Sequence, residues 1–200
     1  MALLSNQIPP GDATMNDEKR LIGFAPDDLT NGRKCLDWKT RYSDREAQRA
    51  ILLEAAYVVV LLFGTPVLIL LIWLEIPRPW LSIDQTQYKV FAGYAYAWLG
   101  GTFGGTLFDT KWLYHSVAKQ LWHLDRRLWR FFTPHISGAL GFAVVLLISS
   151  GILRIFNQTD ISLPAVSLTI GFMVGYFSDS ATAKLTEVAE TLFGATHKQR

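Results

Sequence analysis

The sequence is poor in cysteine and in charged residues, and each shortage excludes a class of protein. Cys35 is the only cysteine among 200 residues, so no disulfide within the chain and no cage of thiolates around a metal can form. Charged residues make up 18% of the chain, against about one-quarter in soluble proteins. The net charge is only +2 and the Lys and Arg residues are scattered, which argues against a nucleic-acid interface.

Sequence motifs for catalysis and cofactor binding are missing as well. The chain contains no His-Glu-x-x-His, Gly-x-Ser-x-Gly or phosphate-binding loop motif. The His123–Arg127 segment contains an acid and bases, but it is more typical of a solvated ion-pair surface than of a catalytic site. A membrane haem needs axial histidines within the helix bundle, whereas the histidines here lie outside the apolar stretches. We therefore expect no enzymatic activity, no metal site and no cofactor. The histidines are His115, His123, His135 and His197.

The sequence does contain four long apolar stretches. They are 24, 19, 18 and 17 residues long, and Glu54 is the only acidic or basic side chain in all four. A bilayer is crossed by about 20 mostly apolar helical residues, with roughly 17 to 25 tolerated. The sequence therefore predicts an all-α, polytopic membrane protein with four transmembrane helices and cytoplasmic helical extensions. The predicted spans are residues 51–74, 90–108, 136–153 and 161–177.

These spans leave room for one domain. Residues 1–42 are expected to form a cytoplasmic N-terminal arm, and residues 43–200 the four-helix transmembrane domain. A capping-box pattern at Ser43–Glu46 predicts a helix that continues into the first span, where Pro66 is expected to introduce a kink. Because the N-terminus lacks the apolar core of a signal peptide, we expect the first span to direct insertion.

The distribution of basic residues predicts the orientation of the spans. Eight Lys and Arg residues precede the first span, five lie between the second and third, and three follow the fourth. The other two connections hold only Arg78, Lys89 and Arg154. Since basic residues collect on the cytoplasmic side, we expect a multi-pass protein of the inner (plasma) membrane with both termini in the cytoplasm.

Small residues recur every four positions along the second and fourth spans. On a helix this spacing forms a stripe without large side chains, against which another backbone can pack closely. Two partners fit such a stripe equally well, namely another span of the same chain or a neighbouring copy of the chain. The stripe residues are Gly93, Ala97, Gly101 and Gly105 in the second span, and Ser167, Gly171 and Gly175 in the fourth.

Two amphipathic cytoplasmic helices are predicted, over residues 111–132 and 180–193. The second is expected to end at Gly194, with its apolar line covered by the 111–132 helix or by a neighbouring subunit. The first carries basic and aromatic side chains that suit docking to lipid headgroups or to a cytoplasmic protein partner. Alternatively, it extends the second span and turns back near Pro134. The candidate docking residues are His115, Lys119, Trp122, Arg126, Trp129 and Arg130.

Two segments in the second half of the chain resemble parts of a group of small bacterial membrane proteins. They are the tail from Gly175 to Phe193, and the run Trp112–Lys119 together with Trp122–Arg130. In these segments the chain is similar to four-span inner-membrane proteins that are encoded beside signalling or anti-phage genes. The resemblance implies a membrane effector or sensor and carries no catalytic residue.

Two functions fit these features. The first is a homo-oligomeric membrane effector or channel-like pore, in which the small-residue stripes join subunits and polar side chains line a pore. The second is a non-conducting membrane scaffold or sensor subunit that recruits a cytoplasmic or membrane partner. The expected partners are therefore the lipid bilayer, a second copy of the chain and a cytoplasmic protein, but no nucleic acid. The candidate pore-lining residues are Ser149, Ser150, Ser167 and Thr169.

Overall fold

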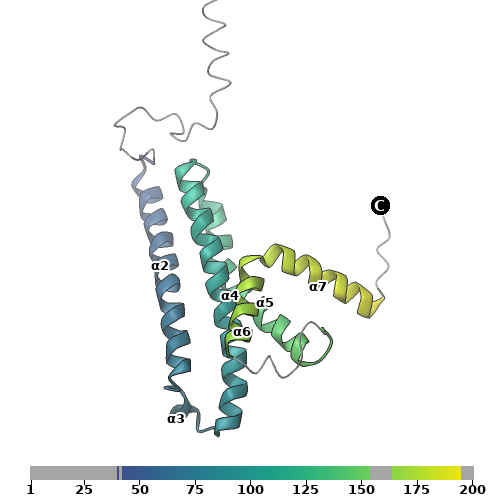
Figure 1. Ribbon diagram of the computed structural model, residues 1–200. Coiled ribbons are helices and arrows are strands. Elements are labelled where there is room, and N and C mark those ends of the chain that lie inside the picture. Colours follow the sequence, from purple (N-terminus) through teal and green to yellow (C-terminus); the bar gives the residue numbers. More distant parts are fainter. Residues whose placement is uncertain (1–39, 41, 154–163, 195–200) are drawn as a thin grey trace, which may run out of the picture. The chain divides into compact units, whose positions relative to one another are not determined.

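The computed structural model describes residues 40, 42–153 and 164–194, and every element in this part of the chain is a helix (Figure 1). The predicted all-α class is confirmed. The predicted N-terminal arm lies almost entirely outside the described residues, as does the connection between the third and fourth predicted spans. The elements are α2 (Arg45–Trp73), α3 (Arg78–Leu81), α4 (Gln85–Ala118), the short 3-10 helix η1 (Leu124–Arg126), α5 (Arg127–Ser149), α6 (Pro164–Tyr176) and α7 (Ser178–Phe193).

Two described segments are long and apolar enough to cross a membrane, namely α2 and the continuous stretch Leu124–Ser149. Their most apolar 18-residue windows have mean hydropathies of 2.6 and 1.9. α6 is apolar but has only 13 residues. α4 has 34 residues, but its glycine, threonine and tyrosine residues lower its hydropathy. By length and hydropathy, the described part of the chain thus contains two candidate membrane-crossing helices, where the sequence predicts four.

α2 begins one residue later than the capping-box pattern indicates. Asp44, not Ser43, is the N-cap, and its carboxylate accepts a hydrogen bond from the backbone N–H of Glu46 at 3.1 Å. Either side chain can cap a helix, but a carboxylate also interacts favourably with the positive end of the helix dipole. The helix then continues through Pro66 to its last residue without interruption.

A short connection that contains α3 leads from α2 to α4, and α4 begins with a capping box. Asp84 accepts a hydrogen bond from the backbone N–H of Gln87 at 2.8 Å, and the Gln87 side chain accepts one from the N–H of Asp84 at 3.3 Å. The Tyr88 hydroxyl donates to the carbonyl of Ile72 at 2.7 Å, which also accepts a hydrogen bond from the backbone N–H of Glu75 at 3.0 Å. The start of α4 therefore lies beside the end of α2, and the two helices are antiparallel.

α4 lies between α2 on one side and the pair α5 and α6 on the other (Figure 1). Its contacts with α6 advance in the same direction along both helices, since Ala97 meets Gly171 and Gly101 meets Gly175. α4 and α6 are therefore parallel. The contacts between α4 and α5 advance in opposite directions, so these two helices are antiparallel. As a result, α2, α4, α5 and α6 alternate in direction along the chain.

The prediction of a single helix over residues 111–132 is wrong. α4 continues to Ala118, Gln120 adopts a left-handed conformation with φ of 58°, and α5 begins at Arg127. The alternative prediction, in which the helix of the second span extends outward and turns back, matches the structure more closely. The turn, however, precedes Arg127, whereas Pro134 lies inside α5. The apolar periodicity continues on both sides of this turn, so periodicity does not reveal the break.

The helix predicted over residues 180–193 is present as α7. It starts two residues earlier, at Ser178, and ends as predicted at Gly194, which has a φ of 64° that glycine adopts without a steric penalty. Leu185 on its apolar line packs against the core cluster that α5 shares with α4. In the structure Val144, Val145 and Ile148 of α5, together with Ala97 of α4, therefore form the surface on which this part of α7 packs.

Candidate functional site

A buried ion pair joins α2 to α5. Glu54 on α2 is 7% exposed, and Arg130 on α5 is 5% exposed. The Arg130 Nε donates to Glu54 Oε2 at 2.8 Å, and Nη2 donates to Oε1 at 3.2 Å. This two-bond geometry is the strong form of an arginine–carboxylate contact. The only charged side chain in the predicted spans is thus paired inside the protein.

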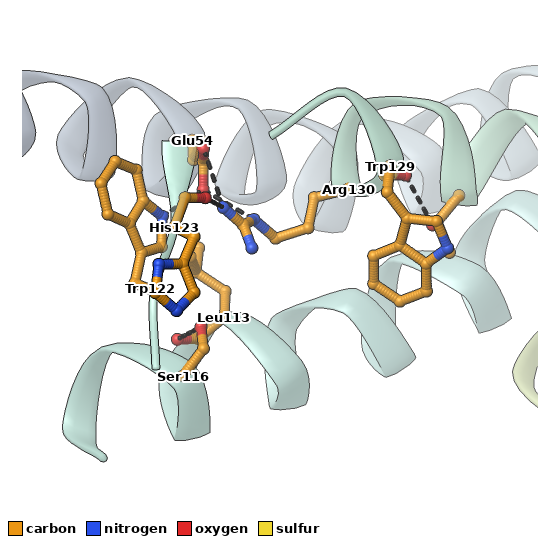
Figure 2. Close-up of polar contacts among 8 residues, drawn as sticks. Glu54, Leu113, Ser116, Trp122, His123, Trp129 and Arg130 are labelled. Carbon is orange, nitrogen blue, oxygen red and sulfur yellow. Dashed lines mark hydrogen bonds and ion pairs between the residues drawn. The ribbon is translucent and has the colours of Figure 1, made fainter. Parts of the chain in front are cut away.

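Two further groups complete this cluster, and both belong to the turn between α4 and α5. Figure 2 shows the Trp122 indole and the Arg130 guanidinium converging on the Glu54 carboxylate. The Trp122 Nε1 donates to Glu54 Oε2 at 2.9 Å, and the Arg130 guanidinium carbon lies 5.7 Å from the Trp122 ring centroid. Arg130 also donates to the carbonyl of His123 at 3.2 Å. The cluster therefore ties α2, the turn and α5 together.

The positions of these residues follow from the helices that carry them. Ala50, Glu54 and Val58 are spaced by four residues and form the buried face of α2, which places the carboxylate against α4 and α5. Burying either charge without its partner costs several kcal/mol. The ion pair therefore favours one register of α2 against α5, and we assign it a positioning role.

Tyr57 makes a second polar link between α2 and α5, one helical turn from Glu54. Its hydroxyl donates to the carbonyl of Phe131 at 2.9 Å and lies 3.0 Å from Nε2 of His135. The Tyr57 ring also stacks on the Phe131 ring, with centroids 5.0 Å apart. The two links together hold the first half of α2 against the start of α5.

A cavity of about 200 Å³ lies beside the ion pair, where Glu54, Arg127 and Arg130 line it together with Asp109 of α4. Asp109 is fully buried, and neither of its carboxylate oxygens has a hydrogen-bond partner among the described residues. It lies just beyond the predicted span 90–108. Burial raises the pKa of Asp109 to about 7, and the charge of Arg130 partly opposes this rise. This carboxyl can therefore bind or release a proton near neutral pH.

The structure divides the candidate docking residues into two groups. Trp122 and Arg130 are buried and bind Glu54, so their assignment to an exposed docking face is wrong. The physical reason is that a buried carboxylate recruits the nearest strong donors. The other four candidates line two adjoining clefts beside α4 and η1. They are His115, Lys119, Arg126 and Trp129.

The small-residue stripes of α4 and α6 face each other inside the chain. A Cβ added at Gly171 would run into the backbone of Ala97, and one added at Gly175 would lie 2.7 Å from the Cα of Gly101. Gly93 lies farther from its neighbour, with the Ser167 hydroxyl 3.9 Å from an added Cβ. Gly105 faces α5, against Ser137. Of the two partners that the stripes allowed, the structure places a helix of the same chain against them.

The candidate pore-lining residues do not share one surface. Ser149 and Ser150 lie at the end of α5 and donate to the carbonyls of Val145 and Leu147. Ser167 is fully buried and faces α4, whereas Thr169 is exposed on α6. Within one copy of the described chain, these four side chains line no common path.

Neither the pairing of Glu54 nor the burial of Asp109 is predicted from the sequence. A lone glutamate in an apolar stretch signals that a partner must exist, because an unpaired buried charge is too costly. The sequence offers several cations for that role, however, and does not indicate which one lies opposite Glu54. Asp109 gives an even weaker signal, since it stands at the edge of a predicted span.

No group of three or more His, Cys, Asp or Glu side chains in the described part of the chain is arranged to hold a metal ion. Comparisons with known proteins assign no function to this arrangement of side chains. No protein family, curated protein or solved structure matches the chain.

Proposed function

We propose that the chain is a multi-pass membrane protein that acts as a non-conducting sensor or scaffold subunit, with its binding surface at the cytoplasmic end. This proposal rests on one observation: both small-residue stripes pack against other helices of the same chain. The pore hypothesis needs those stripes free to join subunits. The contacts between Gly101 and Gly175 and between Ala97 and Gly171 leave no space there for a second chain.

The exposed surface of α2 supports a position in the membrane. Only 11% of its most apolar window is buried, and large apolar side chains such as Val60 and Phe63 are each 68% exposed. A soluble protein rarely leaves so large an apolar surface open to water. The hydrocarbon of a bilayer is the cover that fits a 29-residue helix, which is about 43 Å long.

The alternating directions of the helices support the proposed topology. The start of α2, the end of α4 and the start of α5 meet at one end, as the contacts of Glu54, Leu113 and Arg130 indicate. Arg45 and Arg49, which precede the first span, therefore lie at the same end as the basic residues between the second and third spans. The positive-inside rule assigns this end to the cytoplasm. Arg78 and Lys89 lie at the opposite end.

Ion flux and particle mass together test the proposal. The full-length protein is purified, reconstituted in liposomes and assayed for ion flux at several membrane voltages, while its mass in detergent is measured by light scattering. We expect flux equal to that of protein-free liposomes. Flux that rises in proportion to the protein added would instead favour the channel-like pore. In that case, loss of flux in Gly175→Ala with unchanged melting of the protomer would identify the stripes as subunit contacts.

A further inference from the structure

Two adjoining clefts lie beside the cytoplasmic end of α4. The larger has a volume of about 500 Å³ and lies between α4, Arg126 of η1 and the end of α6. The smaller, of about 340 Å³, shares Trp112, Ser116 and Arg126 with the first and adds Trp129 and Arg130, the cation that pairs with Glu54. Because they share these side chains, we treat them as one double cleft. Its size is that of a site for a small molecule or a lipid headgroup.

The floor of the double cleft is aromatic. The Phe108 ring lies at its centre and contacts three other rings, with centroid separations of 6.4 Å to Trp112, 6.4 Å to Trp129 and 6.3 Å to Tyr176. Trp112 and Trp129 are themselves about half exposed. This floor therefore offers a continuous apolar surface to an apolar part of a ligand.

The rim of the double cleft is basic. Lys111, Lys119 and Arg126 are exposed around it, together with the partly exposed His115. None of the three exposed cations forms an ion pair with a described residue. No acidic side chain among the described residues lines either cleft. The site is thus complementary to an anion that carries an apolar part.

We propose that the double cleft binds an anionic phospholipid of the cytoplasmic leaflet. Its phosphate lies among Lys111, Lys119 and Arg126, and an acyl chain lies along the aromatic floor around Phe108. A lipid supplies the negative charge and the apolar chain in one molecule, at the depth where apolar helices end. This inference rests on the proposed function in one respect, because it requires this end of the protein to face the cytoplasmic leaflet.

Lipid retention by the full-length protein tests the inference. The protein is purified in detergent, mixed with equal amounts of phosphatidylglycerol and phosphatidylcholine, and examined by native mass spectrometry for bound lipid. We expect the wild-type protein to retain phosphatidylglycerol at least tenfold better than phosphatidylcholine. Each basic residue near an anionic surface contributes about fivefold in affinity, so neutralising three of them should reduce retention at least tenfold.

A matched triple variant controls for the loss of positive charge. Its three arginines are exposed, lie at the same end of the protein and do not line the double cleft. We expect this control to change retention less than threefold. Circular dichroism and thermal melting verify that both variants keep the fold. The test variant carries Lys111→Gln, Lys119→Gln and Arg126→Gln, and the control carries Arg45→Gln, Arg49→Gln and Arg127→Gln.

Three results would overturn the lipid site. One is equal retention by the test and control variants, and another is equal retention of the two lipids by the wild-type protein. The third is displacement of the lipid by inorganic phosphate at millimolar concentration, which would indicate a site for a soluble anion. Ion flux with intact lipid selectivity would contradict only the proposed function, whereas absent flux with no lipid selectivity would contradict only this inference.

Discussion

Replacing Glu54 by methionine tests whether the buried ion pair positions α2 against α5. Methionine has a similar length and no charge, so it leaves the Arg130 guanidinium buried without its carboxylate. The change removes both hydrogen bonds from Arg130 and the one from the Trp122 indole. Removing one partner of a buried pair costs about 3–5 kcal/mol. We expect the free energy of unfolding to fall by that amount.

The double variant Glu54→Met with Arg130→Met separates the loss of the pair from the burial of an unpaired charge. Exchanging both members of a buried pair for apolar residues of similar size is often close to neutral. We therefore expect the double variant to be more stable than Glu54→Met alone. The difference measures the coupling between the two side chains.

An exposed ion pair in the same chain provides the control. Lys184 and Glu187 on α7 lie 2.8 Å apart, and their side chains are 76% and 63% exposed. Such pairs contribute about 0–1 kcal/mol, so Glu187→Gln should change stability by less than about 1 kcal/mol. The assay is unfolding in detergent micelles, followed by far-ultraviolet circular dichroism. A loss below about 1 kcal/mol in Glu54→Met, equal to that of the control, would refute the positioning role.

Three more predictions follow from particular contacts. Gly175→Ala should lower stability by about 1–3 kcal/mol through overpacking against Gly101. Gly64→Ala should not lower stability in this way, because a Cβ added there meets nothing within 4 Å. Thermal melting of both variants tests this difference. Trp122→Phe should cost about 1.5–3 kcal/mol, because the indole donates to a charged carboxylate; a melting temperature equal to that of the wild type would contradict it. Because the pKa of Asp109 is raised to about 7, the folded state binds this proton more tightly than the unfolded state. Stability should therefore fall by up to about 2–3 kcal/mol between pH 5 and pH 8. Asp109→Asn should remove that part of the pH dependence, and an identical pH profile in the variant would show that another group is responsible.

If these predictions hold, the two polar features at the end where α4 meets α5 have different roles. The Glu54 cluster is buried and fixes how α2, the turn and α5 meet. The double cleft is open, and the three exposed cations on its rim, Lys111, Lys119 and Arg126, have no ion-pair partner among the described residues. A ligand bound at Arg126 lies only a few residues along the chain from Trp122 and Arg130. Arg130 itself lines the smaller cleft and pairs with Glu54 of α2, so the two features share this side chain.

Much of the helical framework follows from local sequence. The long apolar stretches and the scarcity of charge point to helices that are covered by something other than water. The glycine at position 194 ends α7 because it adopts a positive φ without a penalty. The predicted start of α2 is one residue too early, because Ser43 and Asp44 are both good caps and the sequence pattern does not distinguish them.

The sequence by itself determined which faces of the helices are small, apolar or basic, because these follow from composition and a period of 3.6 residues. Only the tertiary structure decided what each face meets. The stripe at Gly101 faces Gly175 of the same chain, although a second copy fits the same spacing. Trp122 and Arg130 share the periodicity of exposed residues but turn inward to Glu54. The reason is that spacing specifies a surface, whereas pairing a buried charge depends on groups that are far apart in the sequence.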